Sequence, residues 1–172
     1  MQITFVPLAK SHFGLLLKWL ETPHVKTWWD PDIVWTSASV KEKYANYIKE
    51  HKVIDGVVKA IQAYIICVDS WPIGYIQIYN AYDFPRDTIL LGLPKNLAAF
   101  DILIGEIDYL NRGVGAQVLI AFLQKYAASY THVFADPEKT NYAAIRAYEK
   151  AGFEKAHLQP NNKNVWMIKN QR

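Results

Sequence analysis

The sequence has one cysteine, no long apolar run and no cluster of like charge, and each absence excludes a class of protein. A single thiol, Cys67, cannot form an intramolecular disulfide, and its apolar neighbours in residues 63–68 predict a buried, unreactive side chain. No segment reaches the roughly 18 apolar residues of a membrane span. The first residues lack the basic and apolar regions of a signal peptide. We therefore expect a soluble, cytoplasmic protein.

The sequence also has only a small excess of positive charge and few residues that could bind a metal ion. The 19 Lys and Arg residues against 16 Asp and Glu residues give a net charge of +3, and the basic residues are scattered along the chain. This pattern favours neither nucleic acid nor a membrane as a partner. The five histidines lack metal-ligand spacing and one cysteine cannot build a zinc site, so we predict no metal.

What the sequence does contain is apolar and aromatic. Hydrophobic residues make up 51% of the 172, which is enough for one well-packed domain over residues 1–172. The chain has 6 Trp, 11 Tyr and 7 Phe residues. Most of these rings belong in the core, but their number also suggests a cleft with aromatic walls.

Hydrophobic periodicity predicts alternating strands and helices. We expect helices from a cap at Ser11 to a stop at residues 22–24 and over residues 37–51, 113–128 and 141–151, and strands over residues 3–6, 60–69, 73–80, 98–106, 132–135, 153–158 and 165–169. Residues 81–96 have the composition of a loop, and their length suggests a functional one. This order of elements predicts a mixed α/β or α+β sandwich.

The segment most informative about chemistry is Ile104–Gly115, where a strand leads into a glycine turn that opens a helix. Unpaired amides at a helix start and the positive end of its dipole together make a site for phosphate. Gly113 and Gly115 allow the backbone to approach an anion closely, and Arg112 can add charge-assisted hydrogen bonds. A plain strand-to-helix turn would also explain the glycines. The spacing fits neither a Rossmann fingerprint nor a P-loop.

Two segments resemble the GNAT superfamily of N-acetyltransferases. Leu110-Asn-Arg-Gly-Val-Gly115 is similar to the superfamily's Arg/Gln-x-x-Gly-x-Gly/Ala turn, which binds the pyrophosphate of acetyl-CoA, although Leu110 departs from its first position. Asn141-Tyr-Ala-Ala-Ile-Arg-Ala-Tyr-Glu-Lys-Ala-Gly-Phe153 resembles the Asn-x-x-Ala-x-x-x-Tyr-x-x-x-Gly-Phe segment. The resemblance implies a GNAT-like fold, a central mixed and mostly antiparallel sheet flanked by helices, and acetyl-CoA as the cosubstrate.

Further motifs resemble aminoglycoside 6′-N-acetyltransferases over nearly the whole chain. They are the helix-loop Trp19–Trp29 with its H-x-x-x-W-W ending, the segment Pro72–Gln77, the pair Phe100-Asp101, and Asp136-Pro137. This resemblance implies acetylation of the 6′ amine of an aminoglycoside, a small-molecule polycation, and hence antibiotic resistance. For such a substrate we expect an acidic pocket, although the protein as a whole is basic.

Acetyl transfer needs a neutral amine, an oriented thioester and a proton for the departing thiolate. Asp101 lies within a predicted buried strand, where a carboxylate is costly unless it is paired. We expect it to orient the amine and accept its proton; a carboxylate bonded to neighbouring backbone amides is the alternative. By resemblance, Tyr148 matches the superfamily's tyrosine that protonates the sulfur of CoA, and a packed core tyrosine is the alternative.

The resemblance also assigns binding residues. Those expected at acetyl-CoA are Glu106, Ile107, Arg112, Gly113, Val114, Gly115, Ala116, Asn141, Ala144 and Tyr148. Those expected at the aminoglycoside are Trp29, Tyr44, Gln77, Asp101, Asp136 and Asn162, with Asp83 or Asp87 as a further acidic contact and Tyr79 as an aromatic wall. Asn162 stands where the family carries an Asp, and a loop Asp is also a common turn residue.

Two other functions remain open at this point. One is a member of the same superfamily that acts on another amine, such as a siderophore precursor or a protein N-terminus. The other is a non-catalytic acyl-CoA-binding module. The carboxylates expected around the pocket favour an aminoglycoside over a siderophore precursor, and the presence of both Asp101 and Tyr148 favours an enzyme. The sequence does not determine the oligomeric state.

Overall fold

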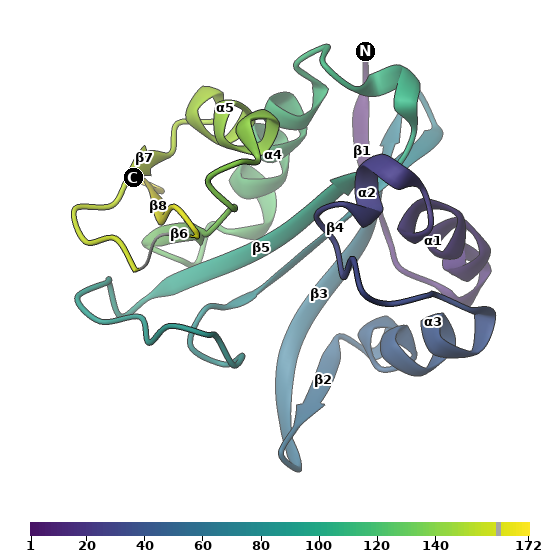
Figure 1. Cartoon of the computed structure of the whole chain (residues 1–172), viewed down its shortest axis with the longest axis horizontal. Helices are drawn as coiled ribbons and strands as arrows, with labels where there is room; N and C mark the ends of the chain where they lie inside the picture. Colours follow the sequence, from purple (N-terminus) through teal and green to yellow (C-terminus); the bar gives the residue numbers. More distant parts are fainter. Residues whose placement is uncertain (161–162) are drawn as a thin grey trace. The chain divides into compact units, whose positions relative to one another are not determined.

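The computed structural model (Figure 1) describes residues 1–160 and 163–172. These residues form two compact units. The first comprises Met1–Gln77 and Ile102–Leu110, and the second comprises Ile78–Asp101 and Asn111–Arg172. Two long strands, β4 (Trp71–Asn80) and β5 (Leu97–Ile104), contribute residues to both units. That the whole chain forms a single domain stays a prediction.

Each unit has its own helices and strands. The first contains α1 (Phe13–Leu20), α2 (Pro23–Lys26), α3 (Ser37–Tyr44), β1 (Ile3–Pro7), β2 (His51–Ile54) and β3 (Val57–Val68), with 3₁₀ turns at Lys10–His12, Tyr47–Lys49 and Ile107–Tyr109. The second contains α4 (Val114–Tyr126), α5 (Tyr142–Lys150), β6 (His132–Ala135), β7 (Glu154–Lys155) and β8 (Met167–Asn170).

The strands of the described residues pair in the order β1-β3-β4-β5-β6-β8-β7, and β2 pairs with β3 outside this path. β1 and β2 run antiparallel to β3, β8 runs antiparallel to β6 and β7, and β5 runs parallel to β6. The parallel pair is connected through α4, since parallel neighbours need a long crossover. The predicted fold class, a mixed and mostly antiparallel sheet with helices, is confirmed.

Some predicted element boundaries are wrong, each for a local reason. The helix expected over residues 37–51 ends at Tyr44, and Glu50 adopts left-handed backbone geometry with φ of 58°. The chain then forms β2, which the sequence analysis missed. Pro23 was expected to stop a helix but begins α2, because proline suits the first helical position. Ser11 lies in a 3₁₀ turn and does not cap α1.

The core of the first unit contains residues of α1, α3 and β3. Leu16, Trp19 and Leu20 of α1 are fully buried, as are Tyr44 of α3 and Ile66 of β3. Their spacing along α1 is that of one helix face, so the apolar pattern of the sequence builds this contact directly. Cys67 of β3 is also buried, as predicted, and burial raises the pKa of its thiol.

β5 ends in a bulge next to this core. The backbone N–H groups of Gly105 and Glu106 both donate to the carbonyl oxygen of Ile73, at 2.8 and 3.1 Å, so two residues oppose one across the strand pair. Gly105 has no room for a side chain, because an added Cβ would collide with the ring of Trp19. The strand expected over residues 98–106 therefore ends earlier, at Ile104.

Gly105→Ala is expected to lower the free energy of unfolding by about 1–3 kcal/mol, the usual cost of overpacking a filled core. The added methyl group must displace Trp19, which is 0% exposed. Gly14→Ala is the matched control, since the same methyl on α1 meets no atom within 4 Å. It should stabilise the protein by up to about 1 kcal/mol through better helix propensity. Denaturant unfolding of both variants tests this; a Gly105→Ala protein as stable as wild type would contradict the packing.

Candidate functional site

The start of α4 presents backbone amides that have no helical acceptor. Gly113 is the N-cap residue, with φ of 75°, and Asn111 before it is also left-handed, with φ of 57°. In the described chain the hydrogen bonds of α4 begin with the Gln117 amide, which donates to the Gly113 oxygen at 3.3 Å. The amides of Val114, Gly115 and Ala116 therefore precede the first helical hydrogen bond.

This turn fits a diphosphate. Free amides, the positive end of a 13-residue helix and the exposed side chain of Arg112 all favour an anion at the same place. The left-handed backbone at Gly113 also explains the glycine, because a side chain there strains the turn even though the space around its Cβ position is open. The residues expected at the pyrophosphate, Arg112–Ala116, are consecutive in the turn that opens α4.

α5 is capped in a way that fixes the position of Tyr148. The Asn141 side-chain oxygen accepts a hydrogen bond from the Ala144 amide at 3.2 Å, as an N-cap residue does. Tyr148 follows Ala144 by one helical turn. Its ring packs edge-on against Phe100, with 5.4 Å between centroids, and lies 5.9 Å from the Phe153 ring. These contacts hold the Tyr148 ring in place.

The pKa of Tyr148 is raised above its ordinary value, first by burial and then by the negative charges of Asp101 and Asp136. All three residues belong to the second unit. A raised pKa means that the phenol keeps its proton throughout the neutral range. Tyr148 therefore keeps a hydroxyl proton that it can donate to a negatively charged atom.

Asp101 of β5 interacts with a second tyrosine as well. Tyr79 of β4 donates its hydroxyl to the Asp101 carboxylate, and burial together with this carboxylate raises the pKa of Tyr79 well above its usual value. Within the second unit, one carboxylate thus acts on two protonated phenols. The side-chain partner of Asp101 could not be identified from the sequence, because Tyr79 is 22 residues away on another strand.

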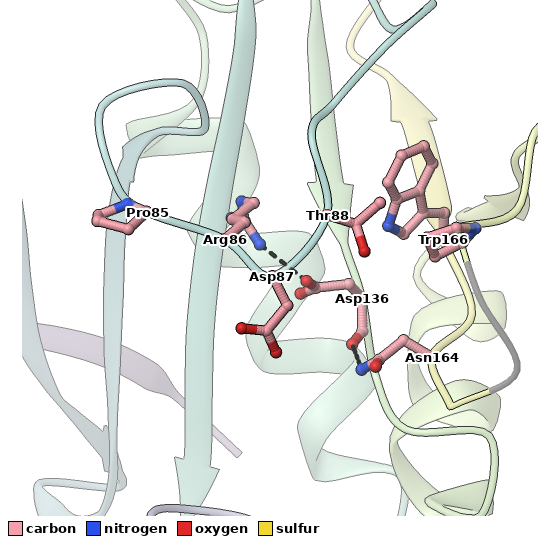
Figure 2. Close-up of a pocket in the computed structure, with 8 residues that line it drawn as sticks. Pro85, Arg86, Asp87, Thr88, Asp136, Asn164 and Trp166 are labelled. Atoms are coloured by element: carbon pink, nitrogen blue, oxygen red, sulfur yellow. Dashed lines mark hydrogen bonds and ion pairs between the residues drawn. The ribbon is translucent and has the colours of Figure 1, made fainter.

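Asp136, which follows β6, lines a cavity of about 210 Å³ in the second unit (Figure 2). The other lining residues are Pro85, Arg86, Asp87, Thr88, Pro160, Asn164 and Trp166. Arg86 Nη1 donates to Asp136 Oδ2 at 2.8 Å, and Asn164 Nδ2 donates to the backbone oxygen of Asp136 at 2.8 Å. Asp136 therefore lines a cavity, where its carboxylate already forms an ion pair with Arg86.

The loop over residues 81–96 supplies Arg86 and Asp87 to this cavity. Two aspartates of this loop were considered as acceptor contacts, and of these Asp87 lines the cavity. Asp83 acts elsewhere, where its charge adds to burial in raising the pKa of Tyr130. Sequence reasoning missed Arg86, although a lone arginine between two aspartates in a long loop was a signal for an ion pair. Trp166, Thr88 and Asn164 had no comparable signal.

In the first unit, the expected acceptor residues Trp29, Tyr44 and Gln77 meet at Tyr75. The Tyr75 hydroxyl donates to Gln77 Oε1 at 2.6 Å. The Tyr75 ring lies edge-on to Tyr44 and Trp29, with centroid distances of 5.6 and 6.0 Å. Tyr44 and Gln77 are buried. Tyr75 was missed, but residues i and i+2 of a strand share a face, so its place beside Gln77 could have been predicted.

Glu106 and Ile107, two residues expected at acetyl-CoA, follow the bulge at the end of β5. Glu106 Oε1 accepts hydrogen bonds from the Trp19 indole at 2.7 Å and from Lys18 Nζ at 2.6 Å. The hydrogen bond from Lys18, followed by that from Trp19, lowers the pKa of the Glu106 carboxyl group. Glu106 therefore holds α1 to the segment after β5, while Ile107 is exposed.

Asn162, expected at the acceptor, lies outside the described residues. Within residues 1–160 and 163–172, no group of three or more His, Cys, Asp or Glu side chains is arranged to hold a metal ion. No helix in that part of the chain is long and apolar enough to cross a membrane.

The mixed sheet, the open amides of α4 and the phenol–carboxylate cluster are features expected of an acyltransferase. The chain belongs to the acetyltransferase (GNAT) domain family, whose model matches residues 9–158. The predicted superfamily is therefore confirmed, and with it the class of enzyme and acetyl-CoA as the acyl donor.

Known proteins of this family resemble the chain over nearly its full length. It is 25% identical over 175 residues to an aminoglycoside N(6′)-acetyltransferase type 1 of Klebsiella pneumoniae, covering 99% of this chain and 84% of the relative. The structure of AAC(6′)-Ib with parmomycin and acetyl-CoA is 24% identical, with a TM-score of 0.81 and coverage of 99% and 94%. AAC(6′)-Ib with coenzyme A and kanamycin gives 24% identity, a TM-score of 0.80 and coverage of 99% and 95%. At this identity, the solved structures support the fold.

Proposed function

We propose that the protein is an acetyl-CoA-dependent aminoglycoside 6′-N-acetyltransferase. The observation that carries the proposal is the cluster in the second unit, where Asp101 acts on the protonated phenols of Tyr79 and Tyr148. The names of the similar proteins supply the class of acceptor, because the relative from Klebsiella pneumoniae is an aminoglycoside N(6′)-acetyltransferase.

Asp101 prepares the acceptor amine for attack. The nitrogen must lose a proton before its lone pair can add to the thioester carbonyl carbon, and the Asp101 carboxylate accepts that proton. The hydrogen bond from Tyr79 holds the carboxylate in one orientation. A positioned general base of this kind contributes about 10²–10⁴-fold to a rate.

Tyr148 acts at the other end of the reaction. As the new C–N bond forms, the C–S bond breaks and the sulfur leaves with the electron pair. Tyr148 donates its hydroxyl proton or a strong hydrogen bond to this sulfur. Its raised pKa keeps the proton in place until the sulfur becomes negative, which is the state that needs it.

The glycine turn binds the donor. Amides at the start of α4 receive the pyrophosphate of acetyl-CoA, with Arg112 adding charge, and Asn141 and Ala144 form the first turn of the helix that carries Tyr148. Within the second unit, the acceptor contacts are Asp101, Asp136, Asp87 and Tyr79. The proposed enzyme works in the cytoplasm, and acetylation removes one positive charge from the antibiotic, which gives resistance.

Gly113→Val is expected to weaken acetyl-CoA binding at least about tenfold, because a β-branched residue resists the left-handed backbone that exposes the α4 amides. Gly56→Val is the matched control. Gly56 has nearly the same φ, 76°, and equally open surroundings, but it lies in the turn between β2 and β3. Calorimetric titration with acetyl-CoA distinguishes the two. Unchanged affinity in a folded Gly113→Val protein would remove the donor site from this turn.

Thiol release from acetyl-CoA, measured with a panel of amines, tests which acceptor the enzyme uses. The panel contains kanamycin, spermidine, a peptide with a free N-terminus and a hydroxylysine-type siderophore precursor. We expect kanamycin to give much the largest kcat/KM. Release with only one of the other amines would assign the protein to a different acceptor within the same family. Binding of acetyl-CoA without release for any amine would indicate a non-catalytic module.

A further inference from the structure

Arg86 is held firmly at the cavity that contains Asp136. Its guanidinium group donates to Asp136 Oδ2 at 2.8 Å and lies 4.9 Å from the centroid of the Phe134 ring. Figure 2 shows the two charged groups pointing toward each other, with a dashed line between them. The side chain of Arg86 is only 15% exposed. Arg86 is therefore a fixed part of the cavity wall.

The pairing of Arg86 with Asp136 affects what the cavity can bind. A substrate ammonium group that approaches Asp136 finds its carboxylate already occupied by a cation. It must either share the carboxylate or displace Arg86, and displacement leaves a largely buried guanidinium without its partner. Breaking a partly buried ion pair in this way is unfavourable. The penalty falls on acceptors that bring a second positive charge to this position.

The net charge of the cavity lining also makes the cavity less favourable for a second ammonium group. Its charged lining residues are Arg86, Asp87 and Asp136, one positive and two negative, which gives a formal charge of −1. Without Arg86 the same lining would carry −2. The remaining polar lining residues, Thr88, Asn164 and Trp166, are neutral and suit hydroxyl groups.

We propose that Arg86 is a specificity-determining residue that acts as the built-in counter-ion of Asp136 and disfavours acceptors that place a second ammonium group there. The inference rests on the proposed aminoglycoside acetylation and refines it. The preferred acceptor is then an amino sugar that presents its reacting amine to Asp101 and a hydroxyl group to the cavity. Acceptors with many amines are acetylated with a higher KM.

The test compares two acceptors with the same reacting group. Kanamycin is a polyamine, and methyl 6-amino-6-deoxyglucoside is a monoamine. In Arg86→Gln and Arg86→Met proteins, the KM for kanamycin should fall about tenfold or more relative to the KM for the monoamine, because a charged hydrogen bond becomes available. Arg86→Met keeps the apolar contact with Phe134, so the test can still be made with this variant if the Arg86→Gln protein does not fold. Asp136 is 40% exposed and can be hydrated when Arg86 is replaced.

Arg86→Lys is the charge-retaining control and should keep the wild-type ratio of the two KM values. A ratio unchanged in the neutral variants of an active enzyme overturns the role of Arg86 and leaves the proposed function standing. If neither amine is acetylated by the wild type or the variants while acetyl-CoA still binds, the proposed function fails and this inference fails with it.

Discussion

Replacing Asp101 with Asn is expected to lower kcat for aminoglycoside acetylation about 100-fold or more, the lower range of general base catalysis. Asn has nearly the same shape and keeps an oxygen that can accept the hydrogen bond from Tyr79, but it cannot take a proton from the amine. The similar shape should keep the stability near that of wild type. The affinity for acetyl-CoA should also stay near wild type, because the donor site lies at the start of α4. Steady-state kinetics with thiol detection give kcat, and calorimetry gives the donor affinity.

Asp55→Asn controls for the loss of one negative charge. Asp55 lies in the exposed turn between β2 and β3, where its φ of 49° also suits Asn. Its kinetics should match those of wild type. Tyr79→Phe gives a second comparison, because it removes the hydrogen bond to Asp101 but keeps the carboxylate. We expect its effect to be smaller than that of Asp101→Asn. An Asp101→Asn enzyme with wild-type kcat would show that this carboxylate does not handle the proton.

Tyr148→Phe has the second large expected effect, a fall in kcat of about 10²–10⁴-fold. The ring contacts with Phe100 and Phe153 remain, so the loss is confined to the hydroxyl group. The KM for the acceptor should change much less than kcat, because the hydroxyl acts on the departing sulfur. Tyr142→Phe is the matched control, since Tyr142 is on the same helix and is 64% exposed.

The pH dependence adds a second readout for Tyr148. Because its pKa is raised above the ordinary value of about 10, the phenol stays protonated over the whole range in which the acceptor amine loses its proton. The rate of the wild type should therefore rise with pH through this range, with no decline between pH 8 and about pH 10 caused by loss of the Tyr148 proton. A Tyr148→Phe enzyme whose chemical step is as fast as in wild type would mean that the residue only packs.

Much of the second unit could be predicted from the sequence, because its signals are local. The glycine turn at Gly113, the apolar face of α4 and the Asn141 cap each lie within a few residues of the structure that they specify. The strand over residues 132–135 is confirmed for the same reason. In the first unit, Asp55-Gly56 was a two-residue hairpin signal before β3, and because it was overlooked β2 was not predicted.

The pairings within the candidate site could not be predicted in this way. Arg86 and Asp136 are 50 residues apart, and Tyr79 meets Asp101 only because β4 and β5 are neighbours in the sheet. Motifs identified the residue types that the chemistry needs, but the partner of each side chain depends on tertiary structure. The need for glycine at position 105 is similar, since the Trp19 ring that excludes a side chain there is far away in the sequence.

The most direct test of the proposed function is the structure of the product. Wild-type protein is incubated with acetyl-CoA and kanamycin, and the purified product is analysed by mass spectrometry and two-dimensional NMR. The proposed function predicts a single added acetyl group on the 6′ nitrogen, formed at a rate that Asp101→Asn and Tyr148→Phe both reduce. An acetyl group on a different nitrogen, or unmodified kanamycin after incubation with a folded protein that binds acetyl-CoA, would contradict it.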